Sequence, residues 1–215
     1  MLRYFFLLTM VAYSLPLLPA NDTLFAPSIR VGLDVSGLAR HLLEPEVMDS
    51  ELSVDIEWRK NHFLALEAGL VSVNVDKESH RYQSDGFFFR LGPDFNVLGR
   101  GDHNPNDLVL LSFRYGYGRL KQEAPFILIS DPYWGDFEDA LDSESYQAHW
   151  LEAGLGLKAE VFRHFFVGWA LRGRLLVARS SRTGMDPYII SGYGKHSGST
   201  NLMLHYHLMY RIPLR

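Results

Sequence analysis

The sequence contains no cysteine. This absence excludes disulfide bonds, thiolate metal sites and attachment of a lipid to an exported cysteine. Charge of either sign is not in excess, since 21 Lys and Arg residues stand against 25 Asp and Glu residues. No basic surface is therefore indicated, and we expect no nucleic-acid partner. Long apolar runs are missing too: the run over residues 5–12 is shorter than the roughly 20 residues that a transmembrane helix needs.

The N-terminus has the form of an export signal. Arg3 precedes the apolar run, which breaks at Ser14 and Pro16, and the small residue Ala20 follows. A basic start, a short apolar run and a small residue are typical of a secretory signal peptide. We predict a signal peptide over residues 1–20, cleaved after Ala20, and one domain over residues 21–215. A membrane anchor that is retained is the alternative.

Apolar and polar residues alternate along much of the chain. From Leu52 to Arg59, every second residue is apolar and each residue between can ionise or form hydrogen bonds. A period of two is typical of a β-strand with one apolar and one polar face. The alternation recurs in eight segments: residues 28–35, 51–59, 62–73, 86–98, 107–118, 145–161, 165–178 and 201–214.

The connections between these segments decide between a barrel and a sandwich. Short connections (60–61, 99–106 and 163–164) alternate strictly with long ones (36–50, 74–85, 119–144 and 179–200). Up-and-down transmembrane barrels have short turns at one end and long loops at the other. We therefore predict an all-β fold, an eight-stranded antiparallel up-and-down β-barrel in the lipid of the bacterial outer membrane. Its short turns are periplasmic and its long loops are extracellular.

Two of the long connections carry a local pattern. Residues 37–47 have the composition of a short helix that ends near Pro45, and residues 125–130 are typical of a strand extension above the membrane. Both are predicted as additions to the loops.

The inward faces of the predicted strands carry nearly equal numbers of acids and bases. An eight-stranded barrel is narrow enough for side chains to fill it, and buried charge is costly unless it is paired. We predict a salt-bridged lumen without a continuous channel, because an ion-selective pore would show an excess of one sign. Its charged members are Asp55, Glu57, Glu67, Arg90, Arg114, Glu152, Lys158, Glu160, Arg172 and Arg174.

Histidines are the candidates for an enzymatic function. They are His149 with Glu152, His205 with His207, and His196 beside Ser197. A serine hydrolase needs its Ser, His and acid in hydrogen-bond reach, which adjacency in sequence does not provide. The pair on one strand face could bind a metal, yet no carboxylate or third His accompanies it at ligand spacing. We predict no catalytic residue, cofactor or metal; a lipid-modifying enzyme at the membrane rim, acting on lipid A acyl chains, is the alternative.

One predicted loop places large aromatic residues away from the bilayer. Asp131, Tyr133 and Trp134 lie together in the motif DPYWG. Exposed Tyr and Trp residues are typical of interface hot spots. We predict a structural or interaction role, in which this loop contacts an envelope protein partner.

Four stretches carry a resemblance to a known family. They are Arg30–Ser36 (RVGLDVS), Asp131–Gly135 (DPYWG), Ala148–Arg174 (AHWLEAGLGLKAEVFRHFFVGWALRGR) and Tyr210–Leu214 (YRIPL). The sequence resembles a family of small outer-membrane β-barrels of the Bacteroidota that has no assigned function. The resemblance implies location and architecture, and it supplies no catalytic or binding residues. Arg215 departs from the aromatic ending that many barrel assembly signals have.

Overall fold

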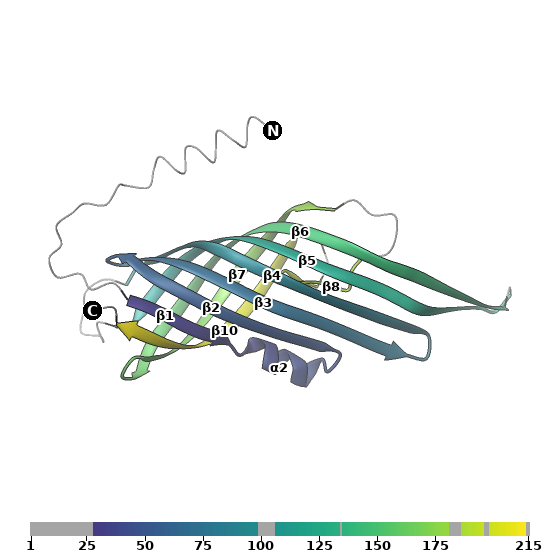
Figure 1. The fold of residues 1–215 in the computed structure, drawn as a ribbon, viewed down its shortest axis with the longest axis horizontal. Coiled ribbons are helices and arrows are strands. Elements are labelled where there is room, and N and C mark those ends of the chain that lie inside the picture. The colour runs from purple at the N-terminus through teal and green to yellow at the C-terminus, as the bar shows by residue number, and fades with distance from the viewer. Residues whose placement is uncertain (1–27, 99–105, 134, 181–185, 196–197, 214–215) are drawn as a thin grey trace, which may run out of the picture.

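Eight strands close into an antiparallel barrel (Figure 1). The structure is a computed structural model that describes residues 28–98, 106–133, 135–180, 186–195 and 198–213. The barrel strands are β1 (Ser28–Asp34), β2 (Val47–Arg59), β3 (His62–Lys77), β4 (His80–Asn96), β5 (Leu108–Asp131), β6 (Gly135–Phe162), β7 (Phe165–Arg179) and β10 (Thr200–Pro213). Each pairs with the next and β1 pairs with β10, so the predicted eight-stranded up-and-down barrel is confirmed. The predicted signal peptide lies outside the described residues.

Alternation of the sequence decides which side chains face the lumen. Along β1, Arg30 and Asp34 are buried whereas Val31 and Leu33 are exposed on the outer face. The same pattern runs along the parts of the other strands that form the barrel wall, because successive side chains of a strand point to opposite faces. The barrel is therefore apolar outside and largely polar inside, the reverse of a water-soluble domain.

One end of the barrel is made of short turns. Asn61 and His164 have φ angles of 66° and 68° in the turns between β2 and β3 and between β6 and β7. Two-residue hairpin turns favour such left-handed conformations. The start of β1 and the end of β10 lie at this same end, on the left of Figure 1. We call it the short-turn end.

The strands run further toward the opposite end than the sequence predicts. β3 and β4 are joined by residues 78–79, and β5 and β6 by residues 132–134. The prediction of long loops over 74–85 and 119–144 is therefore wrong, whereas the predicted strand extension over 125–130 is confirmed. The reason is that backbone pairing continues where the outward side chains become polar, as at Asn74 and Asp76, while Val71, Val73 and Val75 turn inward. The outward apolar period therefore ends before the strand does.

β5 and β6 form an arm that extends beyond the other strands (Figure 1). β6 pairs with β7 only from Ala148 onward, and β5 pairs with β4 only as far as Ile127. We define the arm as residues 123–144, with residue 134 undescribed; its base, residues 123–127 of β5, still pairs with β4. Its sequence contains seven acidic residues and no Lys or Arg. It is thus an acidic β-hairpin attached to the rim of the barrel.

Two smaller elements fill the end opposite the short turns. Helix α2 (Ser36–Leu43) confirms the predicted helix and packs chiefly against β2. β8 (Ile189–Ile190) and β9 (Gly194–Lys195) form a separate two-stranded hairpin. No helix among the described residues is long and apolar enough to cross a membrane.

Candidate functional site

Arg90 lies at the centre of an ion-pair cluster inside the barrel. Its side chain is completely buried and contacts three carboxylates from three other strands. Nη2 pairs with Glu51, Nε lies 2.9 Å from Glu67, and Nη1 lies 3.5 Å from Glu152. Burial of a guanidinium is tolerated when several acceptors surround it.

The cluster continues from Glu67 and Glu152 to three more arginines. Arg172 pairs with both oxygens of Glu67, at 2.6 and 2.7 Å. Arg114 lies 3.6 Å from Glu67 and 2.7 Å from Asp94, and Arg174 Nε lies 2.9 Å from Glu152. Residues of six neighbouring strands, β2 to β7, thus join one cluster across the lumen.

A second group of charges lies nearer the short-turn end. Asp55 accepts from Arg30 at 2.6 Å and from Lys158 at 2.7 Å. Glu160 and Arg211 approach to 3.3 Å. Glu57 lies apart from these pairs, where it accepts hydrogen bonds from Ser28 Oγ (3.4 Å) and from the Asn61 amide (3.2 Å). These contacts give Glu57 no basic partner among the described residues, contrary to its predicted place in the charge network.

Glu51 is a cluster member outside the set predicted from sequence. It stands at the first position of a predicted strand, and the alternation with Leu52 turns its side chain inward. The alternation of side chains along the strand was therefore sufficient to predict that Glu51 faces the lumen.

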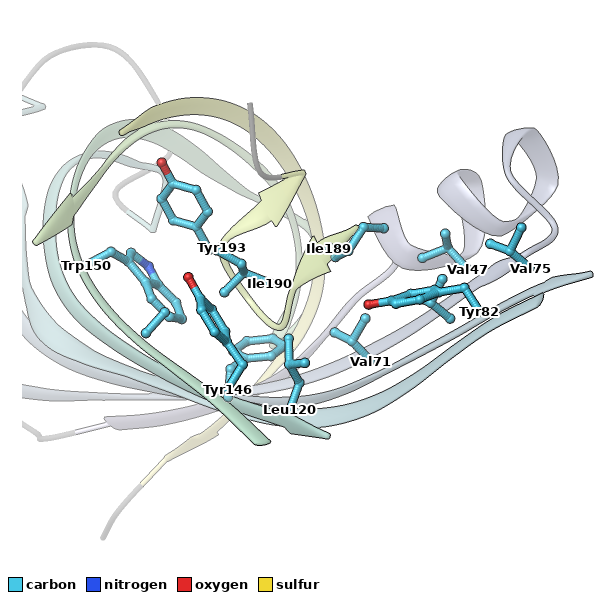
Figure 2. Packing of buried hydrophobic residues seen from close by; sticks show 13 residues of the cluster. Val47, Val71, Val75, Tyr82, Leu120, Tyr146, Trp150, Ile189, Ile190 and Tyr193 are labelled. Atoms are coloured by element: carbon cyan, nitrogen blue, oxygen red, sulfur yellow. The ribbon is translucent and has the colours of Figure 1, made fainter. Parts of the chain in front are cut away.

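The β8–β9 hairpin enters the mouth of the barrel. We call residues 186–195 the plug. Ile190 and Tyr193 of the plug are completely buried and pack among Trp150, Tyr146 and Phe88 (Figure 2). The rings of Trp150 and Tyr193 lie 6.0 Å apart. The plug therefore places an apolar layer in the end of the lumen opposite the short turns.

Glycines allow the plug to approach the wall. A Cβ atom at Gly118 would lie 2.4 Å from the carbonyl oxygen of Ser191. Gly192 has a φ of +75°, and a Cβ there would lie 2.3 Å from the Phe88 ring. Larger residues at these positions would displace the hairpin from the barrel.

Hydrogen bonds join the plug to the ion-pair cluster. Arg174 Nη1 donates to the Tyr193 carbonyl at 2.8 Å, while its Nε pairs with Glu152. The Trp150 indole N–H also donates to Glu152, at 2.7 Å. The prediction that residues 179–200 form an external loop is therefore wrong for the plug, residues 186–195. The pair Ile189–Ile190, apolar within a polar connection, was the available signal.

His205 belongs to a hydrogen-bond chain. Its Nδ1 lies 2.5 Å from Asp34, and Arg174 donates to its Nε2 at 2.7 Å. Asp34, His205 and His207 bring three potential ligand atoms within 4.8 Å of one another. A cation there would have to replace these hydrogen bonds beside the Arg174 guanidinium. The arrangement therefore fits a structural chain better than a metal centre.

The same chain has the wrong order for a serine hydrolase. Ser36 Oγ donates to Asp34 at 2.5 Å, so the acid lies between the hydroxyl and His205. Nucleophilic activation needs the histidine in contact with the hydroxyl. His149 lies on the outer face, 2.6 Å from the Tyr115 hydroxyl, whereas Glu152 faces the lumen. The candidate pair of His149 with Glu152 is therefore not formed.

The remaining predicted residues lie in or near undescribed positions. Asp131 ends β5, and Tyr133 in the adjoining turn is 83% exposed at the tip of the arm. Trp134, His196 and Ser197 lie outside the described residues.

Comparison with solved structures finds outer-membrane proteins. Ail, the attachment invasion locus protein of Yersinia pestis, is 12% identical, with 87% of this chain and 97% of that chain covered and a TM-score of 0.41. A major outer membrane protein from Thermus thermophilus is 12% identical, with 87% and 98% covered and a TM-score of 0.48. At these scores neither likeness carries a conclusion about function. No curated protein matches the sequence.

The family comparison bears on the resemblance seen in the sequence. A match extends over residues 2–215, nearly the whole chain. Its description as a domain of unknown function agrees with the resemblance to a family without an assigned role, while the Bacteroidota origin stays a prediction. The chain belongs to the DUF6048 family, a domain of unknown function.

Proposed function

We propose that this protein is a sealed β-barrel of the bacterial outer membrane that holds the acidic arm outside the cell for an envelope protein partner. Its role is then structural or interactive, and solutes do not pass through it. The predicted signal peptide would deliver the chain to the periplasm, from which such barrels insert with their short turns facing inward.

The outer surface supports placement in a membrane. Its exposed side chains form an apolar band, whose members include Val31, Leu33, Leu64, Leu66, Leu155, Leu171, Leu204 and Leu208. Such a continuous apolar surface is unfavourable in water and favourable in lipid. Closure of the sheet also pairs the barrel backbone, as a hydrocarbon environment requires, except along the edge of β10 that continues past the end of β1.

Aromatic rings gather at two levels along the outer surface. Phe162 packs near Phe165 at 6.4 Å close to the short turns. Phe89 packs near Tyr117 at 5.3 Å toward the other end. Two aromatic girdles are typical of the two interfaces of an outer-membrane barrel. They support a span between the short turns and the arm.

The single observation that carries the sealed lumen is the complete burial of Arg90 among Glu51, Glu67 and Glu152. A continuous water-filled path would expose this guanidinium. The plug adds an apolar layer above the cluster, with Ile190 and Tyr193 also completely buried. Passage of solute would require both layers to rearrange.

The arm supports an interaction role. Tyr133 and Phe137 are 83% and 62% exposed on a hairpin that carries only acidic charge. Aromatic anchors surrounded by charge are common in protein interfaces, and acidic surfaces are complementary to basic ones. The partner we propose therefore presents basic residues around an apolar contact.

A site-specific photocrosslinker tests this proposal in intact cells. p-Benzoylphenylalanine replaces Phe137 on the arm, and Leu155 on the outer face of β6 serves as the control position. We expect one discrete protein adduct from position 137 and none from position 155. No protein adduct at position 137 would contradict the interaction role. A deletion strain should also keep its lipid A acyl pattern; a changed pattern would instead favour a lipid-modifying enzyme at the rim.

A further inference from the structure

The barrel wall has a gap beside its first strand. β1 ends at Asp34, opposite Glu51 of β2 and His207 of β10, while both neighbours continue beyond it. In the described chain, no strand pairs with this edge of β10 between Thr200 and Tyr206. The Tyr206 carbonyl accepts the last contact, from the Val35 amide at 2.8 Å.

Helix α2 fills only part of the gap, because it docks on β2. Arg40 lies 3.2 Å from Asp49, and His41 Nδ1 lies 2.9 Å from the Val47 carbonyl. Gly37 permits this approach, since a Cβ there would lie 2.2 Å from the Asp49 carbonyl oxygen. On the opposite side of the helix, Arg40 Nη2 donates to Met203 Sδ of β10 at 3.7 Å, and the rest of the space between α2 and β10 is open.

A groove of about 450 Å³ lies between α2 and β10. That volume falls within the range of small-molecule sites, about 300–1,000 Å³. Its walls are mostly apolar and include Ala39, Leu43, Leu202, Leu204 and Tyr206, with Ile189 of the plug. The groove therefore runs from the outer face of the wall to the plug.

The groove is continuous with the apolar band. Leu202 and Leu43 in its wall are 65% and 84% exposed, and Leu42, next to Leu43 on α2, is 83% exposed. These side chains have no apolar cover among the described residues, and the surface around them is the surface proposed to face lipid. A hydrocarbon chain entering from the bilayer would cover them without leaving an apolar environment.

Polar groups in the groove have two kinds of role. Lys195 pairs with Glu44 at 2.5 Å, which raises the pKa of Lys195, and Arg40 pairs with Asp49. Neither cation thus requires a charged headgroup. The main chain of β10 offers hydrogen-bond donors instead. In a β-strand, the N–H and C=O groups of every second residue point to the same side. Because the Tyr206 carbonyl points toward Val35, the amides of Leu204 and Leu202 point to the same open side. Ester carbonyls can accept hydrogen bonds from such amides.

We infer that this groove binds one lipid of the outer leaflet, with an acyl chain against Leu43, Leu202 and Leu204 and its ester groups at the unpaired edge of β10. The inference rests on the proposed location of the barrel in the outer membrane. It assigns the gap beside β1 to lipid recognition and leaves the arm for the protein partner.

Retention of lipid by the purified barrel tests the inference. The protein is reconstituted in vesicles of phosphatidylethanolamine and phosphatidylglycerol, transferred to a mild detergent and examined by native mass spectrometry. Ala39→Trp fills the groove, and Leu155→Trp adds the same ring on the outer face of β6. We expect the wild type and Leu155→Trp to retain one lipid, and Ala39→Trp to retain it about tenfold more weakly, equivalent to about 1.4 kcal/mol. Equal retention by Ala39→Trp would overturn the site.

A second measurement keeps the test valid if Ala39→Trp disturbs α2. p-Benzoylphenylalanine replaces Leu202 or Leu155, and photolysis follows transfer to detergent, after bulk lipid has been removed. We expect a lipid adduct at position 202 and none at position 155. A protein adduct at position 202, or equal lipid adducts at both positions, would contradict lipid binding in the groove.

Vesicle flotation distinguishes a wrong membrane location from a wrong lipid site. If the wild-type barrel does not insert into the vesicles, both the proposed location and the lipid site are wrong. If it inserts but retains no lipid in detergent and gives no adduct at Leu202, only the lipid site is wrong.

Discussion

Arg172 and Glu67 form a bidentate ion pair across the full width of the lumen, with nitrogen–oxygen distances of 2.6 and 2.7 Å. Arg172 lies on β7 and Glu67 on β3, which are four positions apart in a ring of eight strands and therefore face one another. Parallel hydrogen bonds between a guanidinium and a carboxylate fix orientation as well as charge. This pair ties opposite walls together at the level where Arg90 and Arg114 also meet Glu67.

Removal of the Glu67 charge should destabilise the barrel. Glu67→Gln keeps the shape of the side chain and leaves Arg172, Arg90 and Arg114 with one shared carboxylate fewer. We expect the free energy of unfolding in lipid vesicles, measured by urea titration, to fall by about 3 kcal/mol, because breaking a buried ion pair leaves an uncompensated charge.

An exposed pair provides the control for that substitution. Asp76 and Arg81 lie 3.0 Å apart with side chains that are 72% and 62% exposed. Asp76→Asn should change the free energy of unfolding by less than about 1 kcal/mol. Equal losses from both substitutions would show that the Glu67 pairs have no special structural role.

The plug should contribute to stability through Ile190. Ile190→Ala removes a completely buried side chain from the cluster around Tyr146 and Trp150. We expect a loss of about 2–5 kcal/mol in the free energy of unfolding. Ile129→Ala on the arm, where the side chain is 53% exposed, is the control and should have little effect. A negligible effect of Ile190→Ala would mean that the hairpin does not pack in the barrel mouth.

Orientation can be determined with single cysteines, since the chain has none of its own. Asn61 occupies a short turn and Tyr133 the tip of the arm. An impermeant thiol reagent on intact cells should label Tyr133→Cys and leave Asn61→Cys unlabelled. Labelling of Asn61→Cys alone would reverse the proposed orientation.

The arm should be dispensable for folding. We expect the double substitution Tyr133→Ala with Phe137→Ala to preserve the heat-resistant migration of the folded barrel in gels, because both side chains are largely exposed. The same variant should reduce the protein adduct formed by a photocrosslinker placed at Glu138. Loss of the folded band would instead show that these aromatic residues stabilise the barrel.

Strand faces were predictable from sequence because each strand has one face toward the lumen. The alternation from Leu52 to Arg59 assigns Asp55 to the interior, where it meets Arg30 and Lys158. It does not show which acid meets which base, since that depends on the register of strands on opposite sides of the barrel. Glu57 shows this limit: it is on the predicted side of its strand but pairs with no base in the described residues.

The alternation of apolar and polar residues is a local pattern, so it could not predict contacts between segments that are far apart in the chain. Asp34 and His205 meet because β1 and β10, the first and last barrel strands, are neighbours in the closed sheet. The plug was missed for a related reason: its burial depends on the barrel that surrounds it, and Ile189–Ile190 is too short to show a period. The arm was missed in part because its two strands break the alternation: residues 126–129 of β5 are all apolar, and residues 135–144 of β6 are mostly polar.

Conductance across planar lipid bilayers tests the sealed lumen most directly. The wild-type barrel, inserted at physiological salt, should give no stable stepwise current, because the Arg90 cluster and the plug occupy the lumen at successive levels. Reproducible, long-lived open channels from the folded wild-type protein would contradict the account.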